Sequence, residues 1–192
     1  MRIRTTLAMA VVMSVAAQAE QAITRTVTVC TEGVADFRVA ATGQMIASKM
    51  LATAGVKIVW RQGLERCPEQ GILITMSDRT PPSVHPGAMA YAMPYEGAHI
   101  RLLYDRIALC EVKLRPHVLA HVLAHEITHI LQGVAGHADA GVMKAHWNQD
   151  DYSAMLRKPL TFTNGDIDMI AVGLAARDAR QLATVATATA GK

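Results

Sequence analysis

The chain has 192 residues, enough for one domain with an adequate hydrophobic core, and 51% of them are hydrophobic while only 4% are aromatic. Its formal net charge is +3; without Arg2 and Arg4, 17 of the 19 basic residues remain against 16 acidic ones. A nearly neutral chain offers no electrostatic basis for binding nucleic acid, so we exclude that class of partner.

The first residues have the pattern of a secretory signal peptide. A basic start is followed by an apolar run over 7–17, and 17–19 reads Ala-Gln-Ala, a small-x-small cleavage site. The run is shorter than the roughly 20 residues that span a bilayer, and no later stretch is long and apolar enough. We therefore expect residues 1–19 to be removed. Residues 20–192 should then form a single secreted or periplasmic domain, monomeric and without a stable membrane anchor.

The order of predicted elements indicates an α+β fold. Strands are expected where β-branched residues alternate or lie between turn residues, over 24–29, 56–60, 71–76, 88–93 and 99–104. Helical periodicity and capping residues predict helices over 36–54, 116–131 and 166–180. Residues 134–160 are expected to be irregular, and the Ala/Thr-rich end at 182–190 to be frayed. This order predicts a twisted mixed sheet, mostly parallel, with two long helices and a small C-terminal subdomain.

Three cysteines, Cys30, Cys67 and Cys110, suit an oxidising compartment in which one pair forms a disulfide and one thiol is left over. The sequence does not choose the pair. Because none belongs to a C-x-x-C pair, a cysteine zinc site is not expected.

The strongest helical pattern of the chain contains His125-Glu126-Ile-Thr-His129. Residues four apart on a helix lie on nearly the same face, so two imidazoles there can reach one tetrahedral zinc at about 2.0–2.1 Å. Glu126 lies beside the first ligand, where it can accept a proton from a zinc-bound water. Zinc lowers the pKa of that water and polarises a substrate carbonyl. We expect Zn²⁺ as cofactor and Glu126 as the catalytic base.

A third ligand cannot come from a further turn of the same helix, because the next turn carries it away from the metal. Gly133 permits the chain to bend back, and His137 follows four residues later. Three neutral imidazoles and one open position make a catalytic zinc site. Asp139 is the alternative third ligand. A downstream Glu ligand is excluded because no Glu follows Glu126.

The run from His125 to Met143 resembles the metzincin branch of the zincin metallopeptidases and small bacterial secreted proteins with the same HExxH pattern. The likeness is specific over residues 119–147. It implies a long active-site helix, a Gly bend at Gly133, His137 as third ligand and Met143 in a tight turn beneath the zinc. The intervals from the second His to Gly and from Gly to the third His are each one residue longer here than in the usual pattern.

Other polar residues can be interpreted either as ordinary structural residues or as parts of the site. His117 and His121 continue the stripe at four-residue steps, and we expect ordinary polar side chains near a cleft rather than an extra site. Relatives place a substrate-stabilising Tyr near the Met turn, so His146 or Tyr152 is a candidate for that role. The same resemblance implies that the edge strand at 88–93 pairs with an extended substrate.

The leading expectation is a zinc metallopeptidase that acts on a peptide or protein substrate. One alternative is a catalytically inactive zinc-binding or interaction protein, which a closed fourth ligand such as His121 or His146 would favour. The other is a hydrolase of a cell-wall amide, with the same zinc ligands.

Overall fold

The computed structural model describes residues 24–33, 35–63, 66–92 and 98–190. The expected signal peptide at 1–19 lies outside these residues. Within the described part of the chain, none of the helices combines the length and apolar character needed to cross a bilayer.

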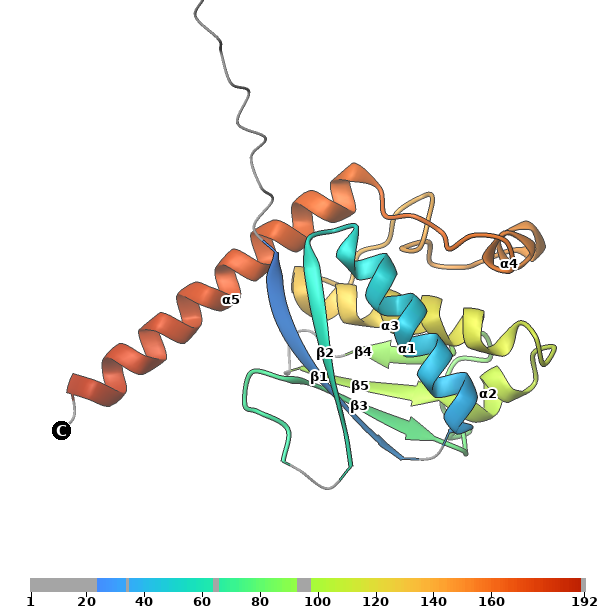
Figure 1. Ribbon diagram of the computed structural model, residues 1–192, viewed down its shortest axis with the longest axis horizontal. Helices are drawn as coiled ribbons and strands as arrows, with labels where there is room; N and C mark the ends of the chain where they lie inside the picture. The colour runs from blue at the N-terminus through green and yellow to red at the C-terminus, as the bar shows by residue number, and fades with distance from the viewer. Residues whose placement is uncertain (1–23, 34, 64–65, 93–97, 191–192) are drawn as a thin grey trace, which may run out of the picture.

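The chain forms a mixed five-stranded sheet in the order β2-β1-β3-β5-β4 (Figure 1). Its strands are β1 Arg25–Gly33, β2 Val56–Gln62, β3 Ile72–Ser77, β4 Ala90–Ala92 and β5 His99–Leu103. Neighbouring strands are parallel except β4, which runs antiparallel to β5. The predicted mostly parallel sheet is therefore confirmed. The predicted edge strand is shorter than 88–93, and Met93 lies outside the described residues.

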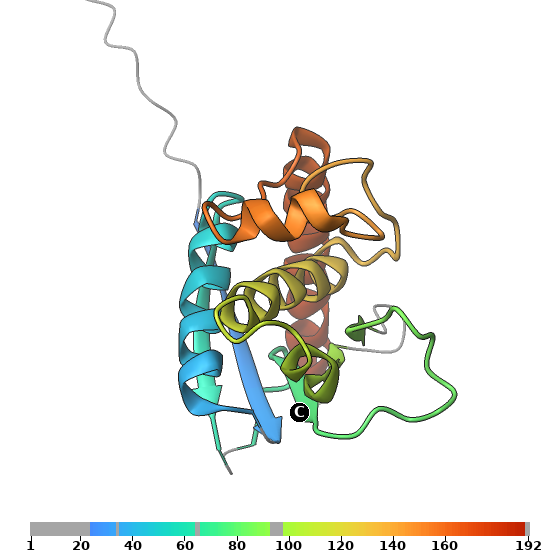
Figure 2. The ribbon, with the colours of Figure 1, turned by 90° about the vertical axis from the view of Figure 1, so that its right-hand side faces the viewer.

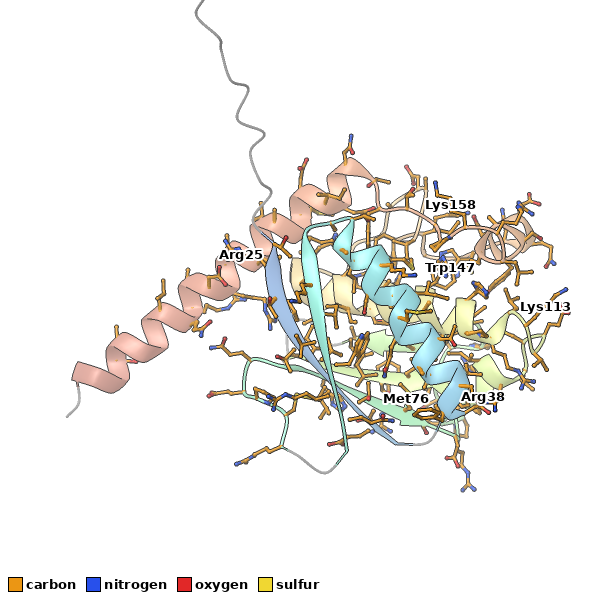
Figure 3. All side chains as sticks on the ribbon, in the orientation of Figure 1. Arg25, Arg38, Met76, Lys113, Trp147 and Lys158 are labelled. Carbon is orange, nitrogen blue, oxygen red and sulfur yellow. A yellow bond between two sulfur atoms is a disulfide. The ribbon has the colours of Figure 1, made fainter. Side chains whose placement is uncertain are left out.

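Two long helices, α1 Phe37–Ala52 and α3 Arg115–Gln132, pack against each other and against the sheet (Figures 1 and 2). Asp36 caps α1, because its carboxylate accepts the backbone N–H groups of Arg38 and Val39 at 2.9 and 3.0 Å. Buried side chains of both helices and of alternate strand residues fill the space between them (Figure 3). Charged residues such as Lys113 lie at the rim.

The C-terminal part contains more helix than the sequence pattern predicts. α4 Gln149–Met155 lies inside the segment 134–160 that was expected to be irregular. It begins with a capping box. The Asn148 side chain accepts the N–H of Asp151, and the Asp151 side chain accepts the N–H of Asn148. α5 Asn164–Ala190 continues through the end that was expected to fray, because Ala is the strongest helix former. A short helix, α2 Tyr104–Ala108, was also not predicted.

The disulfide joins Cys30 of β1 to Cys67, in the segment that precedes β3, and Cys110 is a free thiol. The bond ties the β2–β3 connection to β1, the strand between β2 and β3. Burial raises the pKa of the Cys110 thiol.

Candidate metal centre

α3 carries the HExxH residues through the interior of the molecule. Every residue from Val118 to Gln132 is buried, and the fully buried positions include Leu119, Leu123 and Ile127. The helix ends at Gly133, which has φ 70° in the left-handed conformation, as the bend after the motif predicts. A helix enclosed on all sides has little freedom to shift, so the side chains it carries are held by the core.

The rings of His125 and His129 are oriented by backbone carbonyl groups. Nδ1–H of His125 donates to the Val142 oxygen at 2.9 Å, and Nδ1–H of His129 donates to the Val134 oxygen at 3.1 Å. A carbonyl oxygen only accepts, so Nδ1 holds the proton in each neutral ring and Nε2 keeps a lone pair. This is the arrangement by which histidines are prepared as metal ligands.

The two Nε2 atoms face each other at 3.0 Å. Burial lowers the pKa of both rings, that of His129 to about 4, so both are neutral at pH 7. Two unprotonated nitrogens cannot hydrogen-bond to each other, and their lone pairs converge on a point that suits a cation. Two nitrogens bound to one tetrahedral zinc are about 3.3 Å apart. The observed spacing fits that geometry.

His137 completes the group. One ligand nitrogen from each of His125, His129 and His137 lies within 4.8 Å of the other two. The His137 ring centroid is 5.3 Å from that of His125 and 5.0 Å from that of His129. The side chain is exposed, unlike the helical pair. Asp139, the alternative ligand, does not belong to this group.

The segment after α3 is folded into a turn that carries His137 and supplies the carbonyl group that orients His125. Ala138 N–H donates to the Met143 oxygen at 2.9 Å, and Val142 N–H donates to the Thr161 oxygen at 3.0 Å. Gly141 has φ 76°, which lets the chain turn between these bonds. Met143 is fully buried in the core, and the residue before it supplies the carbonyl that orients His125.

Glu126 lies beside the group with its carboxylate almost enclosed. Its exposed fraction is 8%, and the backbone N–H of Ala92 donates to it. Burial raises the pKa of Glu126 to about 7, despite that hydrogen bond. A carboxyl group with a pKa near the working pH is well suited to accept and return a proton.

A cleft of about 470 Å³ opens onto His125, Glu126 and His137. The segment from His85 to Ala90, which leads into β4, forms one wall, and Lys144, His146, Trp147 and Tyr152 lie on the other parts of the lining. The structure thus brings both His146 and Tyr152 to the cleft, where a role toward substrate stays a prediction.

The wall before β4 is fixed to α2 by side-chain hydrogen bonds. The Arg106 guanidinium donates to the carbonyl oxygens of His85, at 2.6 Å, and of Ala88. The Asp105 carboxylate accepts the N–H and hydroxyl of Thr80 at 2.9 and 2.8 Å. These bonds had no visible signal in the sequence, because they join residues far apart in the chain and half of them end on backbone oxygens.

His121 has a structural role. It is fully buried, its Nδ1–H donates to the His117 oxygen at 2.7 Å, and its Nε2 accepts the N–H of Leu160 at 2.9 Å. The expectation of an ordinary polar side chain near a cleft was therefore wrong for His121, since both ring nitrogens are used inside the protein. Neither His121 nor His146 belongs to the metal-binding group of the described residues, so neither closes a fourth position.

Comparison with known proteins identifies the fold. Archaemetzincin from Methanopyrus kandleri superposes with a TM-score of 0.53 at 13% sequence identity, over 81% of this chain and 98% of that one. Archaemetzincin from Archaeoglobus fulgidus, complexed with malonate, gives 0.52 at 13% identity, over 75% and 99%. No protein-family model matches the sequence, and no curated protein matches it significantly. At this level of identity the likeness concerns the fold, and the chain has an archaemetzincin-like fold.

Proposed function

We propose that the protein is a zinc-dependent hydrolase that cleaves peptide bonds. The observation that carries this proposal is the pair of inward-facing Nε2 atoms of His125 and His129, 3.0 Å apart, with His137 beside them. Their Nδ1 atoms are already occupied by backbone carbonyls, which leaves three imidazole nitrogens for one ion. Imidazole ligands suit zinc, and three of them with an open position are typical of catalytic sites.

When bound, zinc would act as a Lewis acid toward a substrate carbonyl and make an attacking water more acidic. Glu126 would accept the proton of that water and return it to the leaving amine. Its burial beside the ligands supports this role, because the carboxylate can be protonated near neutral pH. The Ala92 N–H holds the carboxylate in place between β4 and α3.

A peptide is the favoured substrate because the cleft lies between α3 and an edge strand. β4 has a paired neighbour on one side only among the described strands, and the segment before it is fixed by Arg106. An extended chain can align with such an edge through main-chain hydrogen bonds. The archaemetzincin-like fold and the metzincin-like motif support the same class of enzyme. The disulfide between Cys30 and Cys67 is consistent with the expected secretion.

The test compares wild type with Glu126→Gln and with Glu111→Gln as a matched control. Glu111 is exposed and makes a surface ion pair with Lys113. Zinc content of the purified proteins and hydrolysis of fluorescein-labelled casein are measured together. We expect stoichiometric zinc in all three proteins, full turnover with Glu111→Gln, and turnover reduced by roughly 10²–10⁴-fold with Glu126→Gln.

Retained turnover in Glu126→Gln would overturn its assignment as the base. A wild type without affinity for zinc would overturn the enzyme proposal. Zinc binding without hydrolysis of casein, but with hydrolysis of a cell-wall amide, would change the substrate class and keep the metal centre.

A further inference from the structure

A second hollow of about 400 Å³ lies away from the HExxH group, between the first half of β1 and α5. β1 pairs with β2 from Arg25 onward but with β3 only from Val29 onward. The place next to residues 25–28, where β3 would continue, is therefore not filled by a strand. The turn at 68–71, closed by Gly71 N–H on the Pro68 oxygen at 2.7 Å, lines the hollow ahead of β3.

Backbone groups of β1 point into this gap. Arg25 N–H donates to the Gly55 oxygen on the β2 side at 2.9 Å, and consecutive strand residues direct their backbone groups to opposite sides. Thr26 and Thr28 therefore face the hollow, and both line it. Because pairing with β3 begins at Val29, the described strands offer no ladder partner on this side to the N–H and C=O of Thr26 or to the N–H of Thr28. An open strand edge is a template for another strand.

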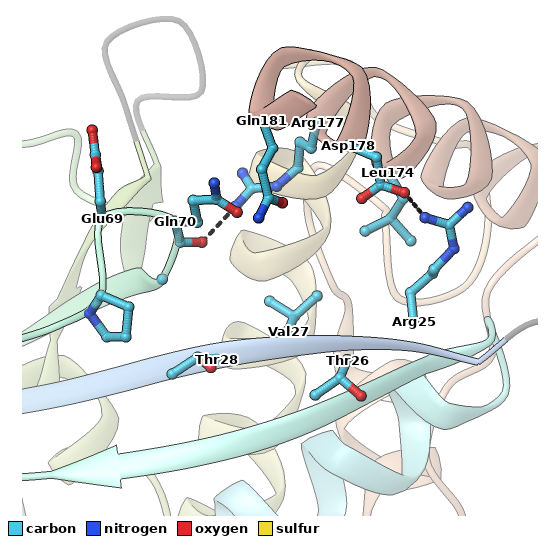
Figure 4. A pocket seen from close by; sticks show the side chains of 12 residues that line it. Arg25, Thr26, Val27, Thr28, Glu69, Gln70, Leu174, Arg177, Asp178 and Gln181 are labelled. Carbon is cyan, nitrogen blue, oxygen red and sulfur yellow. Dashed lines mark hydrogen bonds and ion pairs between the residues drawn. The ribbon is translucent and has the colours of Figure 1, made fainter. Parts of the chain in front are cut away.

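The hollow also holds the cation Arg177, and the carboxylates Glu69 and Asp178 line it as well, the second of them paired with Arg25. The Arg177 guanidinium donates to the Gln70 backbone oxygen at 2.9 Å, and no carboxylate of the described residues makes an ion pair with it. Burial lowers the pKa of Arg177, and the nearby Arg180 lowers it further. In Figure 4, Gln181 extends from α5 toward β1, and Arg177 extends from α5 toward Gln70. The Arg25–Asp178 ion pair lies at the other end of the view.

We propose that this hollow is a binding site for an extended peptide that carries a carboxylate. The peptide backbone would pair with Thr26 and Thr28 in line with β3, and its carboxylate would accept hydrogen bonds from Arg177. β-Strand addition supplies affinity through the main chain, and a charged pocket supplies specificity. The site is separate from the cleft and does not depend on the proposed hydrolysis. It would hold an acidic, extended segment of a protein partner.

The test uses a fluorescein-labelled, C-terminally amidated hexapeptide of alternating Thr and Val whose last residue is Glu. Binding is measured by fluorescence anisotropy to the Glu126→Gln protein, so that the probe stays intact whether or not the enzyme proposal holds. We expect saturable binding, weakened about tenfold by adding Arg177→Gln, the loss of one charge-assisted hydrogen bond. Arg38→Gln, the same change at an exposed position of α1, should leave the affinity unchanged.

Two further probes identify the interaction. A hexapeptide with Gln in place of its Glu should bind the protein that keeps Arg177 about as weakly as the original probe binds the Arg177→Gln protein. Combining the Gln probe with Arg177→Gln should weaken binding no further. A probe N-methylated on alternate residues should not bind. In amide hydrogen exchange, the Thr26 and Thr28 N–H groups should exchange rapidly in the free protein and become protected by the probe.

The proposal is overturned if no probe binds, or if binding is insensitive to Arg177 and leaves Thr26 and Thr28 unprotected. Protection that increases with protein concentration without any probe would assign the edge to a second copy of the chain and equally overturn the peptide site. Circular dichroism of Arg177→Gln checks that loss of binding does not reflect loss of fold.

Discussion

The two regions that supply the metal-binding group are built differently. His125 and His129 are carried by α3, whose residues are buried on every side. His137 lies on the exposed segment between α3 and α4, which is shaped by a few backbone hydrogen bonds and by glycines in the left-handed conformation. The helix thus provides a pair of ligands fixed by packing, whereas the third ligand is an exposed side chain on a turn that is anchored to the core by Val142 and Met143.

The regions are nevertheless coupled. The carbonyl that orients His125 belongs to Val142 of the turn, and the carbonyl that orients His129 belongs to Val134 just after the helix. The segment therefore does more than deliver His137, because it also fixes the tautomers of the helical pair. Loosening the turn should affect all three ligands.

The largest expected effect comes from removing one ligand from each region. His129→Ala should abolish zinc retention, since it leaves one helical ligand and a void in a buried site. His137→Ala should weaken zinc binding at least about 100-fold, more than the usual loss of a supporting hydrogen bond, and should leave the fold intact. Zinc affinity by competition with a chelator and the thermal midpoint of the metal-free proteins measure both effects. Equal affinity of His137→Ala and wild type would remove His137 from the site, and Asp139 would be tested next.

Two glycines of the segment allow the cost of a left-handed backbone conformation to be separated from the cost of steric overlap. Gly133 and Gly141 have φ 70° and 76°, but a Cβ on Gly133 meets nothing within 4 Å, whereas one on Gly141 would lie 2.2 Å from the Thr161 oxygen. Gly133→Ala should cost about 1 kcal/mol of unfolding free energy, the left-handed penalty alone. Gly141→Ala adds a backbone overlap and should cost about 3 kcal/mol or more, with weaker zinc binding. Denaturant unfolding measures the difference, and equal costs would show that the turn relaxes freely.

A third, pH-dependent effect concerns His121, which joins α3 to the stretch after α4 through the Leu160 N–H. Burial lowers its pKa from 6.5 to about 4. Above pH 6.5 the ring is neutral in both states and stability is not affected. As the pH falls from 6.5 toward 4, His121 is protonated in the unfolded chain but stays neutral in the folded one. The free energy of unfolding therefore falls by about 3 kcal/mol.

In the metal-free state, the unfolding free energy of His121→Gln should therefore fall by about 3 kcal/mol less than that of wild type between pH 7 and 4. The variant starts from a lower stability at pH 7. Chemical denaturation at a series of pH values measures the slope. His125 and His129 remain in both proteins, so their own contribution cancels in the comparison. Identical slopes would show that His121 takes up its proton in the folded state.

Local signals account for what the sequence predicted. The helical periodicity around His125, the glycine after the helix and His137 beyond it were all visible, because each acts within a few residues. The carbonyl partners of the ligand rings were not visible, since Val134 and Val142 contribute backbone atoms that any residue has. The disulfide pair was also open, because it depends on which strands become neighbours.

The helices of the C-terminal part were underestimated for a different reason, since their capping signals were present. Asn148-x-x-Asp151 begins α4, and Thr163-x-x-Asp166 begins α5. α4 lies in a stretch poor in apolar periodicity, which is the signal that indicates a helix most strongly, whereas α5 was predicted over 166–180 and extends beyond that prediction at both ends. The caps mark where both helices begin.

The smallest expected effect tests that conclusion at Thr163. Its N–H and hydroxyl donate to the buried Asp166 carboxylate at 2.8 Å, and its hydroxyl accepts the Asp166 N–H at 3.2 Å. Thr163→Ala should lower the unfolding free energy by about 1 kcal/mol, whereas Thr163→Ser, which keeps the hydroxyl, should be nearly neutral. Because α5 packs on the end of α3, the loss should be accompanied by faster hydrogen exchange at Gln132, whose side chain donates to the Asp166 backbone oxygen at 3.3 Å. Unchanged stability of Thr163→Ala would mean that the packing of α5 on α3, and not its cap, decides where this helix begins.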